Sequence, residues 1–214
     1  MEDRMQFVLD GFKKYEVTNY FKEVLKLNPS NMLPYHNLNH IVVMCYHLLK
    51  CIQLYGISHN DARLLLIAGL YHDWAHSGGK LTDKENVEIA ISGMVCSFVF
   101  NEVEGNTNDI EEITNIIKAT EYPYVIPHDE LSLLQKIIRD CDLLMCFEDN
   151  WLHQVIMGLK EEMNLAIEKI LFGEITFIHE MKFSTTYGQE IYDQKSSQLI
   201  ANVTRLLEIL TIEK

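Results

Sequence analysis

A histidine and an aspartate stand side by side at the end of the most apolar stretch of the sequence. The eight residues 64–71 carry no charge, and the motif Tyr71-His72-Asp73-Trp74-Ala75-His76 closes them. Ionisable side chains at the end of a buried helix cost free energy unless a partner binds them. A divalent metal ion is a usual partner, because imidazole and carboxylate together form a mixed nitrogen and oxygen ligand set. The motif therefore predicts a metal site.

Two further segments place ligand-type side chains in apolar, helix-like sequence. In Tyr35-His36-Asn37-Leu38-Asn39-His40 we expect the two histidines on one face of a helix, about one turn apart. Arg139-Asp140-Cys141-Asp142-Leu143-Leu144 places two aspartates in another apolar stretch. A lone histidine in a helical protein is usually a surface or hydrogen-bonded residue. The combination of His40, His72-Asp73 and a late buried aspartate, each on its own helix, favours a shared site, because metal ligands converge in this way in helical bundles.

The overall composition limits the kinds of partner that the protein can bind. Its 214 residues suit one domain, and 48% of them are hydrophobic, which suffices for a large core. Eighteen Lys and Arg residues against 31 Asp and Glu residues leave a formal net charge of −13. We expect no nucleic-acid or anionic-membrane partner, because both need a basic surface. A small anionic substrate remains compatible, since metal ions reverse the sign of charge locally.

The cysteines, the length of the apolar runs and the first residues of the sequence bear on where in the cell the protein is located. The five cysteines form no Cys-x-x-Cys pair, so we expect reduced thiols in an intracellular protein. The longest apolar run is far shorter than the roughly 20 residues that span a bilayer. The opening Met1-Glu2-Asp3-Arg4 lacks the apolar core of a signal peptide. We therefore expect a cytoplasmic protein without a membrane span.

The pattern of apolar residues predicts an all-α fold. Only four prolines and ten glycines interrupt the chain, and strand-like alternation is scarce. We expect a single domain over residues 1–214, with one or two opening helices that stop near Asn28-Pro29. Gly173 is expected to break the helical pattern, and residues 174–188 favour irregular helix over strand. Ser58-His59-Asn60-Asp61 offers a capping box for the helix that carries the apolar segment 64–75. The other predicted helices cover about residues 35–55, 82–100, 108–120, 129–147, 151–172 and 189–210.

Beyond composition, the spacing His…His-Asp…Asp resembles that of the HD superfamily of metal-dependent phosphohydrolases. Tyr35-His36-Asn37-x-x-His40 and His72-Asp73-x-x-His76-x-Gly78 are similar to motifs of its cyclic-nucleotide phosphodiesterase branch. Asp83-x-x-Asn86-x-Glu88, Ala119-Thr120 and Asp140-x-Asp142-Leu143 are similar to stretches of small bacterial-type members. The likeness covers about residues 35–146. It implies an all-α HD-domain bundle with a metal site at its centre, a core over about residues 30–150, and C-terminal helices that complete the bundle.

The resemblance also implies a ligand set. His40, His72, Asp73 and one of the two late aspartates would hold a first metal ion, and Asp73 would bridge to a second ion held mostly by water. Asp142 is preferred to Asp140, because it aligns better with the Asp-Leu pair of the phosphodiesterases. The implied cofactors are two divalent ions, drawn from Mn, Zn, Mg and Fe.

The expected chemistry is hydrolysis of a phosphate ester by metal-activated water. A bound metal ion lowers the pKa of water from about 15.7 toward 7, which supplies the nucleophile. His36 is not needed as a ligand and lies close to His40, so we expect it to protonate the leaving group as a general acid. We expect His76 to orient waters or a phosphate oxygen. Asn86 and Glu88 are candidates for holding waters of the second ion, with helix capping as the alternative.

The expected substrate is a small-molecule phosphate ester of a nucleotide, and the choice between cyclic and linear nucleotides stays open. Cyclic-nucleotide phosphodiesterases grip the base with a glutamine followed by an aromatic residue, and none of Gln189, Gln194 and Gln198 has matching surroundings. Two alternatives remain: a non-catalytic HD module that binds a nucleotide or a partner protein, and a di-iron HD oxygenase. The oxygenases recruit additional histidines between the His-Asp pair and the final aspartate. Only His76 and His128 lie there, which counts against that alternative.

Overall fold

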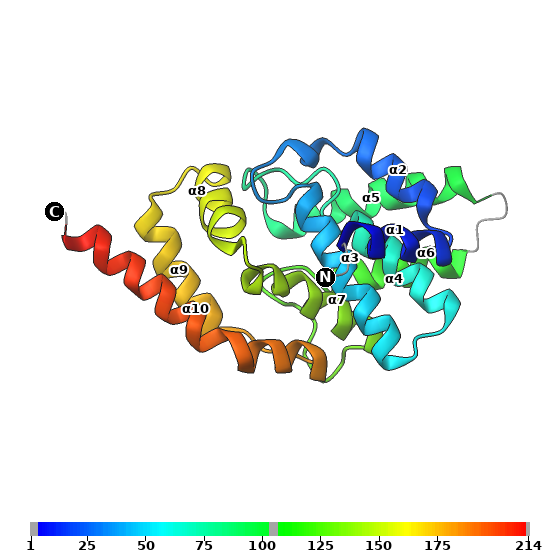
Figure 1. The fold of residues 1–214 in the computed structure, drawn as a ribbon. Coiled ribbons are helices and arrows are strands. Elements are labelled where there is room, and N and C mark those ends of the chain that lie inside the picture. The colour runs from blue at the N-terminus through cyan, green and yellow to red at the C-terminus, as the bar shows by residue number, and fades with distance from the viewer. Residues whose placement is uncertain (1–3, 103–106, 213–214) are drawn as a thin grey trace.

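The computed structural model describes residues 4–102 and 107–212, and within them it contains helices and connecting loops without a strand. The prediction of an all-α fold is confirmed (Figure 1). The elements in chain order are α1 (Arg4–Lys14), α2 (Thr18–Leu27), η1 (Pro29–Met32), α3 (Leu38–Tyr55), α4 (His59–Tyr71), α5 (Asp83–Asn101), α6 (Thr107–Lys118), α7 (Leu133–Leu143), η2 (Leu144–Phe147), η3 (Leu152–Met157), α8 (Gly158–Glu162), α9 (Ile167–Glu180) and α10 (Thr186–Ile212).

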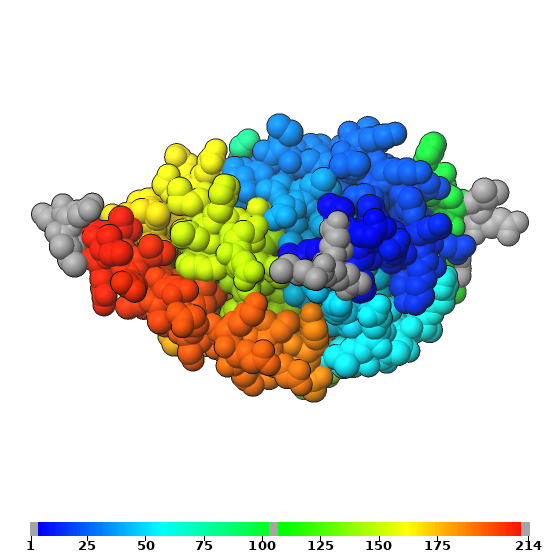
Figure 2. All heavy atoms as spheres, viewed as in Figure 1, coloured from blue at the N-terminus to red at the C-terminus, as the bar shows by residue number. Residues whose placement is uncertain are grey.

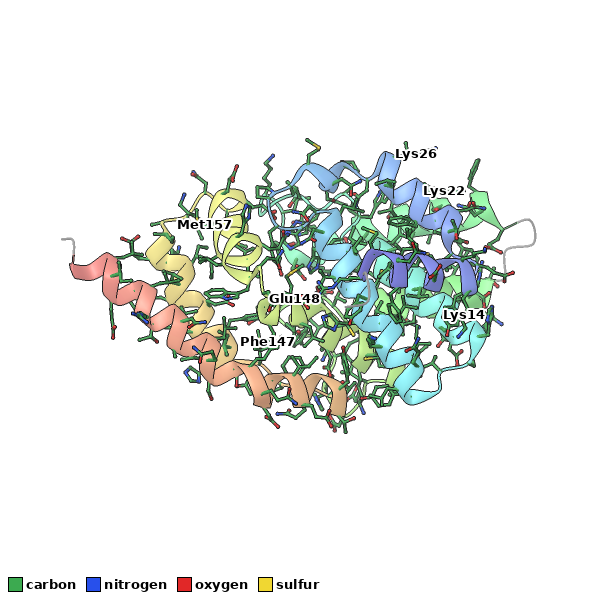
Figure 3. The ribbon with its side chains drawn as sticks, in the orientation of Figure 1. Lys14, Lys22, Lys26, Phe147, Glu148 and Met157 are labelled. Atoms are coloured by element: carbon green, nitrogen blue, oxygen red, sulfur yellow. The ribbon has the colours of Figure 1, made fainter. Side chains whose placement is uncertain are left out.

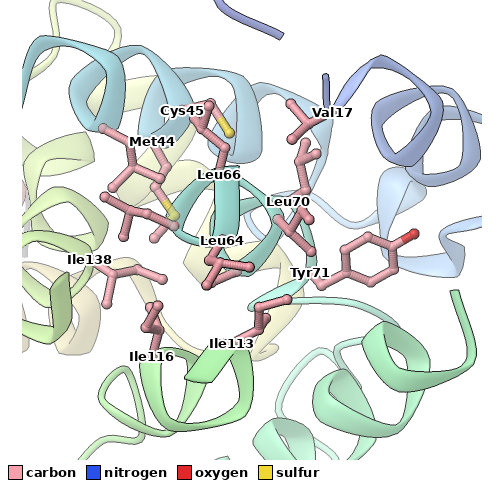
Figure 4. Close-up of a cluster of buried hydrophobic side chains, with 14 of the residues drawn as sticks. Val17, Met44, Cys45, Leu64, Leu66, Leu70, Tyr71, Ile113, Ile116 and Ile138 are labelled. Carbon is pink, nitrogen blue, oxygen red and sulfur yellow. The ribbon is translucent and has the colours of Figure 1, made fainter. Parts of the chain in front are cut away.

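Helix α4 is the central element of the larger hydrophobic cluster. Every residue from 64 to 71 is buried, as expected for a helix that is apolar all round. Figure 4 shows side chains of α3, α6 and α7 around Leu64 and Leu66, with Val17 and Tyr71 at the other side of the cluster. Because α4 is surrounded in this way, its C-terminal end lies inside the molecule and not at the surface. His72, which follows it directly, is therefore buried, and Asp73 is partly buried.

The C-terminal helices form a second hydrophobic cluster beside the first. Helices α9 and α10 pack along each other, and α10 follows one edge of the molecule (Figures 1 and 2). The two clusters are joined by polar contacts as well as by packing. Glu148, labelled in Figure 3, accepts hydrogen bonds from Arg4 at 2.5 Å and from His47 at 3.0 Å. Within the second cluster, Lys195 of α10 donates to the Phe147 carbonyl at 2.8 Å.

Several predicted helix boundaries are wrong, for local reasons. The helix predicted at 151–172 is divided into the π-helix η3, the short α8 and the start of α9. Asn164, with φ of 51°, interrupts it after α8. Gly173 does not break the pattern but lies within α9, where a glycine costs only about 1 kcal/mol relative to alanine. The N-terminal capping box Thr82–Glu85 of α5 is present as predicted.

No helix in residues 4–102 or 107–212 is long and apolar enough to cross a membrane.

Candidate metal centre

The His-Asp pair lies in a tight turn just after α4, and two upstream side chains hold that turn. Ala75 has φ of 56°, which few non-glycine residues adopt. Asn28 accepts a hydrogen bond from the Ala75 N–H at 2.9 Å. Ser30 donates to the Asp73 carbonyl and accepts from the His76 N–H, both at 2.8 Å. These contacts fix where the side chains of the turn point.

Four side chains from three separate regions of the chain converge at this turn. His40 enters from the first turn of α3, and Asp142 enters from α7. His40 Nε2 lies 3.1 Å from His72 Nε2, 3.2 Å from Asp73 Oδ2 and 3.1 Å from Asp142 Oδ1. His72 Nε2 lies 3.0 Å from Asp73 Oδ2 and 3.4 Å from Asp142 Oδ1. The cluster is buried at its two imidazoles, whereas Asp142 is partly exposed.

The donor set fits a divalent cation. His72 Nδ1 lies 2.9 Å from the Gly69 carbonyl, so the ring donates there and presents the Nε2 lone pair to the cluster. Asp73 Oδ2 has no hydrogen-bond partner in the described part of the chain, although both imidazoles are near it. Four potential metal-ligand atoms thus face one another. With metal–ligand bonds of about 2.1 Å, neighbouring donors lie about 3.0 Å apart in octahedral and about 3.4 Å apart in tetrahedral coordination, which matches the observed spacings.

The electrostatics of the cluster also favour positive charge at this position. Burial alone would lower the pKa of His40, but the carboxylates of Asp142 and Asp73 raise it to about 9. The pKa of His72 is also raised, against the effect of its burial. Burial alone would raise the pKa of Asp73 and Asp142, but the neighbouring imidazoles lower it. Protons on the imidazoles therefore take the place that a cation would take.

The two late aspartates have different surroundings. Asp140 is fully buried and accepts hydrogen bonds from the backbone N–H groups of Ser184 and Thr185 and from the Thr185 hydroxyl. These bonds hold the loop between α9 and α10. Asp142 is the one that faces His40 and His72.

A second group of ionisable side chains, His36, His76 and Glu162, lies beside the cluster. The rings of His36 and His76 are tilted by 30° to each other, with centroids 3.6 Å apart. Glu162 of α8 pairs with His36 Nδ1 and accepts hydrogen bonds from the backbone N–H groups of Tyr35 at 2.9 Å and His36 at 3.2 Å. These three side chains are also close enough to share a metal ion. However, both Glu162 oxygens already have partners, so the group is a hydrogen-bonded network.

His36 does not share a helix with His40, so that prediction is wrong. Helix α3 begins at Leu38, and the Asn37 side chain caps it by accepting from the N–H groups of Asn39 and His40. His36 therefore lies in the non-helical segment before the cap. The close approach of α8 positions it there, since a Cβ on Gly158 would lie only 2.9 Å from the Pro34 carbonyl oxygen.

A pocket of about 580 Å³ opens onto both groups of side chains. Asp73, Asp142, His36 and His76 lie at its polar end, and apolar residues of η3, α8 and α9 form much of the remaining wall. Asn86 lines the pocket as well, although its side-chain oxygen accepts a hydrogen bond from the Ser77 N–H at 2.9 Å. Glu88 is exposed and does not line this pocket, so its predicted role beside the metal site is not supported.

Sequence patterns left several of these residues out. Glu162 was missed because it follows an ordinary lysine–glutamate run with no motif around it. Asn28 and Ser30 had a usable signal, because Asn-Pro-Ser is typical of a turn in which asparagine accepts from the backbone two residues on. That bond is present at 3.1 Å.

No protein-family model matches the chain, and no curated protein matches it significantly. The geometry by itself establishes a candidate site: His40, His72 and Asp73 form a buried group that could hold a metal ion, and Asp142 approaches both imidazoles.

Proposed function

We propose that this protein is a metal-dependent phosphohydrolase of the HD type that hydrolyses a phosphate ester of a nucleotide. The observation that carries the proposal is the convergence of four potential metal-ligand atoms beside an open pocket. A structural ion would be closed off by its ligands, whereas this cluster faces a space that can admit a substrate. His40, His72, Asp73 and Asp142 would hold the ion.

A divalent ion at this position supplies two effects: it lowers the pKa of a water molecule and neutralises charge on the phosphoryl oxygens. The remaining requirement is a proton for the leaving oxygen. His36 lines the same pocket, and its Nδ1 is bound to Glu162. The carboxylate orients the ring, so that Nε2 is the atom available to donate a proton to the leaving group.

His76 has a different proposed task, because it is held neutral. Burial and the charge of the neighbouring His36 together lower its pKa to about 4. The Gly78 N–H approaches His76 Nδ1 at 3.2 Å, which makes Nδ1 the acceptor and leaves the proton on Nε2. A neutral N–H donor of this kind can orient a phosphate oxygen without competing with His36 for the role of acid.

The test is a screen for hydrolysis with the protein loaded separately with Mn²⁺, Zn²⁺, Mg²⁺ and Fe²⁺. Substrates should include cyclic nucleotides, nucleoside monophosphates and nucleoside triphosphates, with released phosphate or nucleotide as the readout. We expect metal-dependent hydrolysis of at least one of them, and its loss in Asp73→Ala. If folded, metal-loaded protein hydrolysed none of these esters, the proposal would be wrong.

A further inference from the structure

The lining of the pocket includes a second polar feature that the proposed chemistry does not use. Glu174 of α9 lines the pocket and is only 5% exposed, and its Oε1 atom has no hydrogen-bond partner within the described residues. Buried polar atoms are normally paired, so an orphan that borders a cavity points to a partner from outside the chain. The wanted partner is a hydrogen-bond donor, because a carboxyl oxygen accepts.

Glu174 is also poorly suited to bind a cation by charge alone. Burial raises its pKa to about 7, and the adjacent Cys146 thiol only partly offsets that rise. A carboxyl in this state can donate one hydrogen bond and accept another. Its best complement is a group with a donor next to an acceptor, which is the arrangement at the amino-bearing edge of a nitrogen heterocycle.

The surroundings of Glu174 fit a flat organic group. Tyr122 and Tyr124 reach the pocket from the loop after α6, and Phe177 comes from α9. The Tyr122 ring lies 5.4 Å from that of Tyr124 and 5.8 Å from that of Phe177, so the three form one aromatic wall. Aromatic walls of this kind hold planar rings through their faces and edges.

Space for such a group lies next to Glu174. Gly173 borders the pocket, and a Cβ built on it meets no atom within 4 Å. Gly173 is exposed, so a side chain added there would extend into the open space at the border of the pocket and not into the protein. This position offers a steric probe of whether a ligand occupies the pocket.

We propose that Glu174 is a specificity-determining residue, and that it selects phosphate esters whose organic group is a planar heterocycle with an amino group beside a ring acceptor. Adenine and cytosine have this edge, whereas hypoxanthine and uracil present a carbonyl in place of the amino group. The proposal rests on the proposed function for the position of the phosphate at the metal end. It adds the residue that recognises the heterocycle of the substrate.

The test uses equilibrium binding of phosphonate analogues that cannot be hydrolysed. The probes are the 5′-phosphonates of adenosine, inosine, cytidine and uridine, and the base-free ribose 5-phosphonate. Wild-type protein should bind the amino-bearing member of each pair about tenfold more tightly, and Glu174→Leu should remove that preference. Wild-type protein and Glu174→Leu should bind ribose 5-phosphonate with equal affinity. Glu180→Leu, on an exposed position of the same helix, is the matched control and should keep the preference.

Gly173→Leu supplies a second, independent measurement. It should weaken all four nucleoside phosphonates and leave ribose 5-phosphonate unchanged, with no fall in melting temperature. An unchanged affinity for the nucleosides, or a preference that survives in Glu174→Leu, would overturn the proposal. Base preference without any hydrolysis would leave this subsite standing and reject the proposed activity. Hydrolysis without base preference would support the proposed activity and reject this subsite.

Discussion

Asp140 and Asp142 are two residues apart in α7, and their carboxylates serve different parts of the molecule. Asp140 holds the backbone of Ser184 and Thr185, and Asp142 faces the imidazoles of His40 and His72. Side chains at i and i+2 of a helix do not share a face, which is the reason that one sequence motif supplies both roles.

Substitution of these two aspartates should therefore separate folding from metal binding. Asp140→Ala leaves two buried backbone N–H groups without their acceptor, and we expect a loss of about 2–4 kcal/mol in the free energy of unfolding. Asp142→Ala should cost about 1 kcal/mol or less in chelator, because its side chain is partly exposed. Denaturant unfolding with EDTA measures both. A larger loss for Asp142→Ala than for Asp140→Ala would contradict the assignment.

The position of Glu162 depends on the glycine one turn before it. In Gly158→Ala the new methyl group would collide with the Pro34 carbonyl, so α8 must move and carry Glu162 away from His36. We expect turnover to fall to a similar extent in Gly158→Ala and Glu162→Gln, with metal content unchanged. Glu161→Gln, at the exposed neighbouring position of α8, is the matched control and should keep wild-type turnover. Wild-type turnover in Gly158→Ala would count against this role of α8.

Proton competition should make metal binding depend on pH. In the metal-free protein the pKa of His40 is raised to about 9, so its stabilising effect is complete below its unfolded pKa of about 6.5 and is lost as the pH rises through about 9. A metal ion must displace that proton, so its apparent affinity should rise up to about tenfold per pH unit between about pH 7 and 9. An ion concentration of a hundred times Kd adds about 2.7 kcal/mol to the free energy of unfolding.

Thermal melts with EDTA and with added metal, taken across this pH range, measure the effect. The increase in melting temperature caused by metal should grow with pH. A metal-induced increase that is the same at every pH, or absent in demonstrably metal-free protein, would show that the protons and the ion do not share the cluster.

Substitutions of His36 and of His40 should have different effects on metal content and turnover. His40→Ala should lower metal occupancy. His36→Ala should keep its metal and lose about 10²–10⁴ in turnover, the usual contribution of a positioned general acid. The loss should be smaller for p-nitrophenyl esters, whose leaving group needs little protonation. Steady-state rates on two substrates that differ in leaving-group pKa, with a metal assay of each variant, decide the matter. An equal loss on both substrates would assign His36 a purely structural role.

The metal-site residues could be predicted because metal binding restricts residue type and spacing at once. His40, His72, Asp73 and Asp142 are unusual as ligand-type side chains in apolar helices, and the structure brings them together. The all-α class could be predicted because strand-like alternation is scarce and few prolines and glycines interrupt the chain.

Residues that act through tertiary packing had no such signal. Glu162 reaches His36 across 126 positions of sequence, and the contact depends on how closely α8 approaches the segment before α3. Glu174 becomes notable only because its carboxyl is buried beside a cavity. The start of α3 was placed too early, because Asn37 competes for the backbone N–H groups that a continuous helix would have to use.

Metal content tests the central claim most directly. Protein purified without chelator should contain at least one divalent transition ion per chain by elemental analysis, and Asp73→Ala should contain almost none. Asp149→Ala, which removes an exposed carboxylate outside the cluster, should match the wild type. Full occupancy in folded Asp73→Ala, or wild-type protein that takes up no divalent ion even on dialysis against it, would contradict the account.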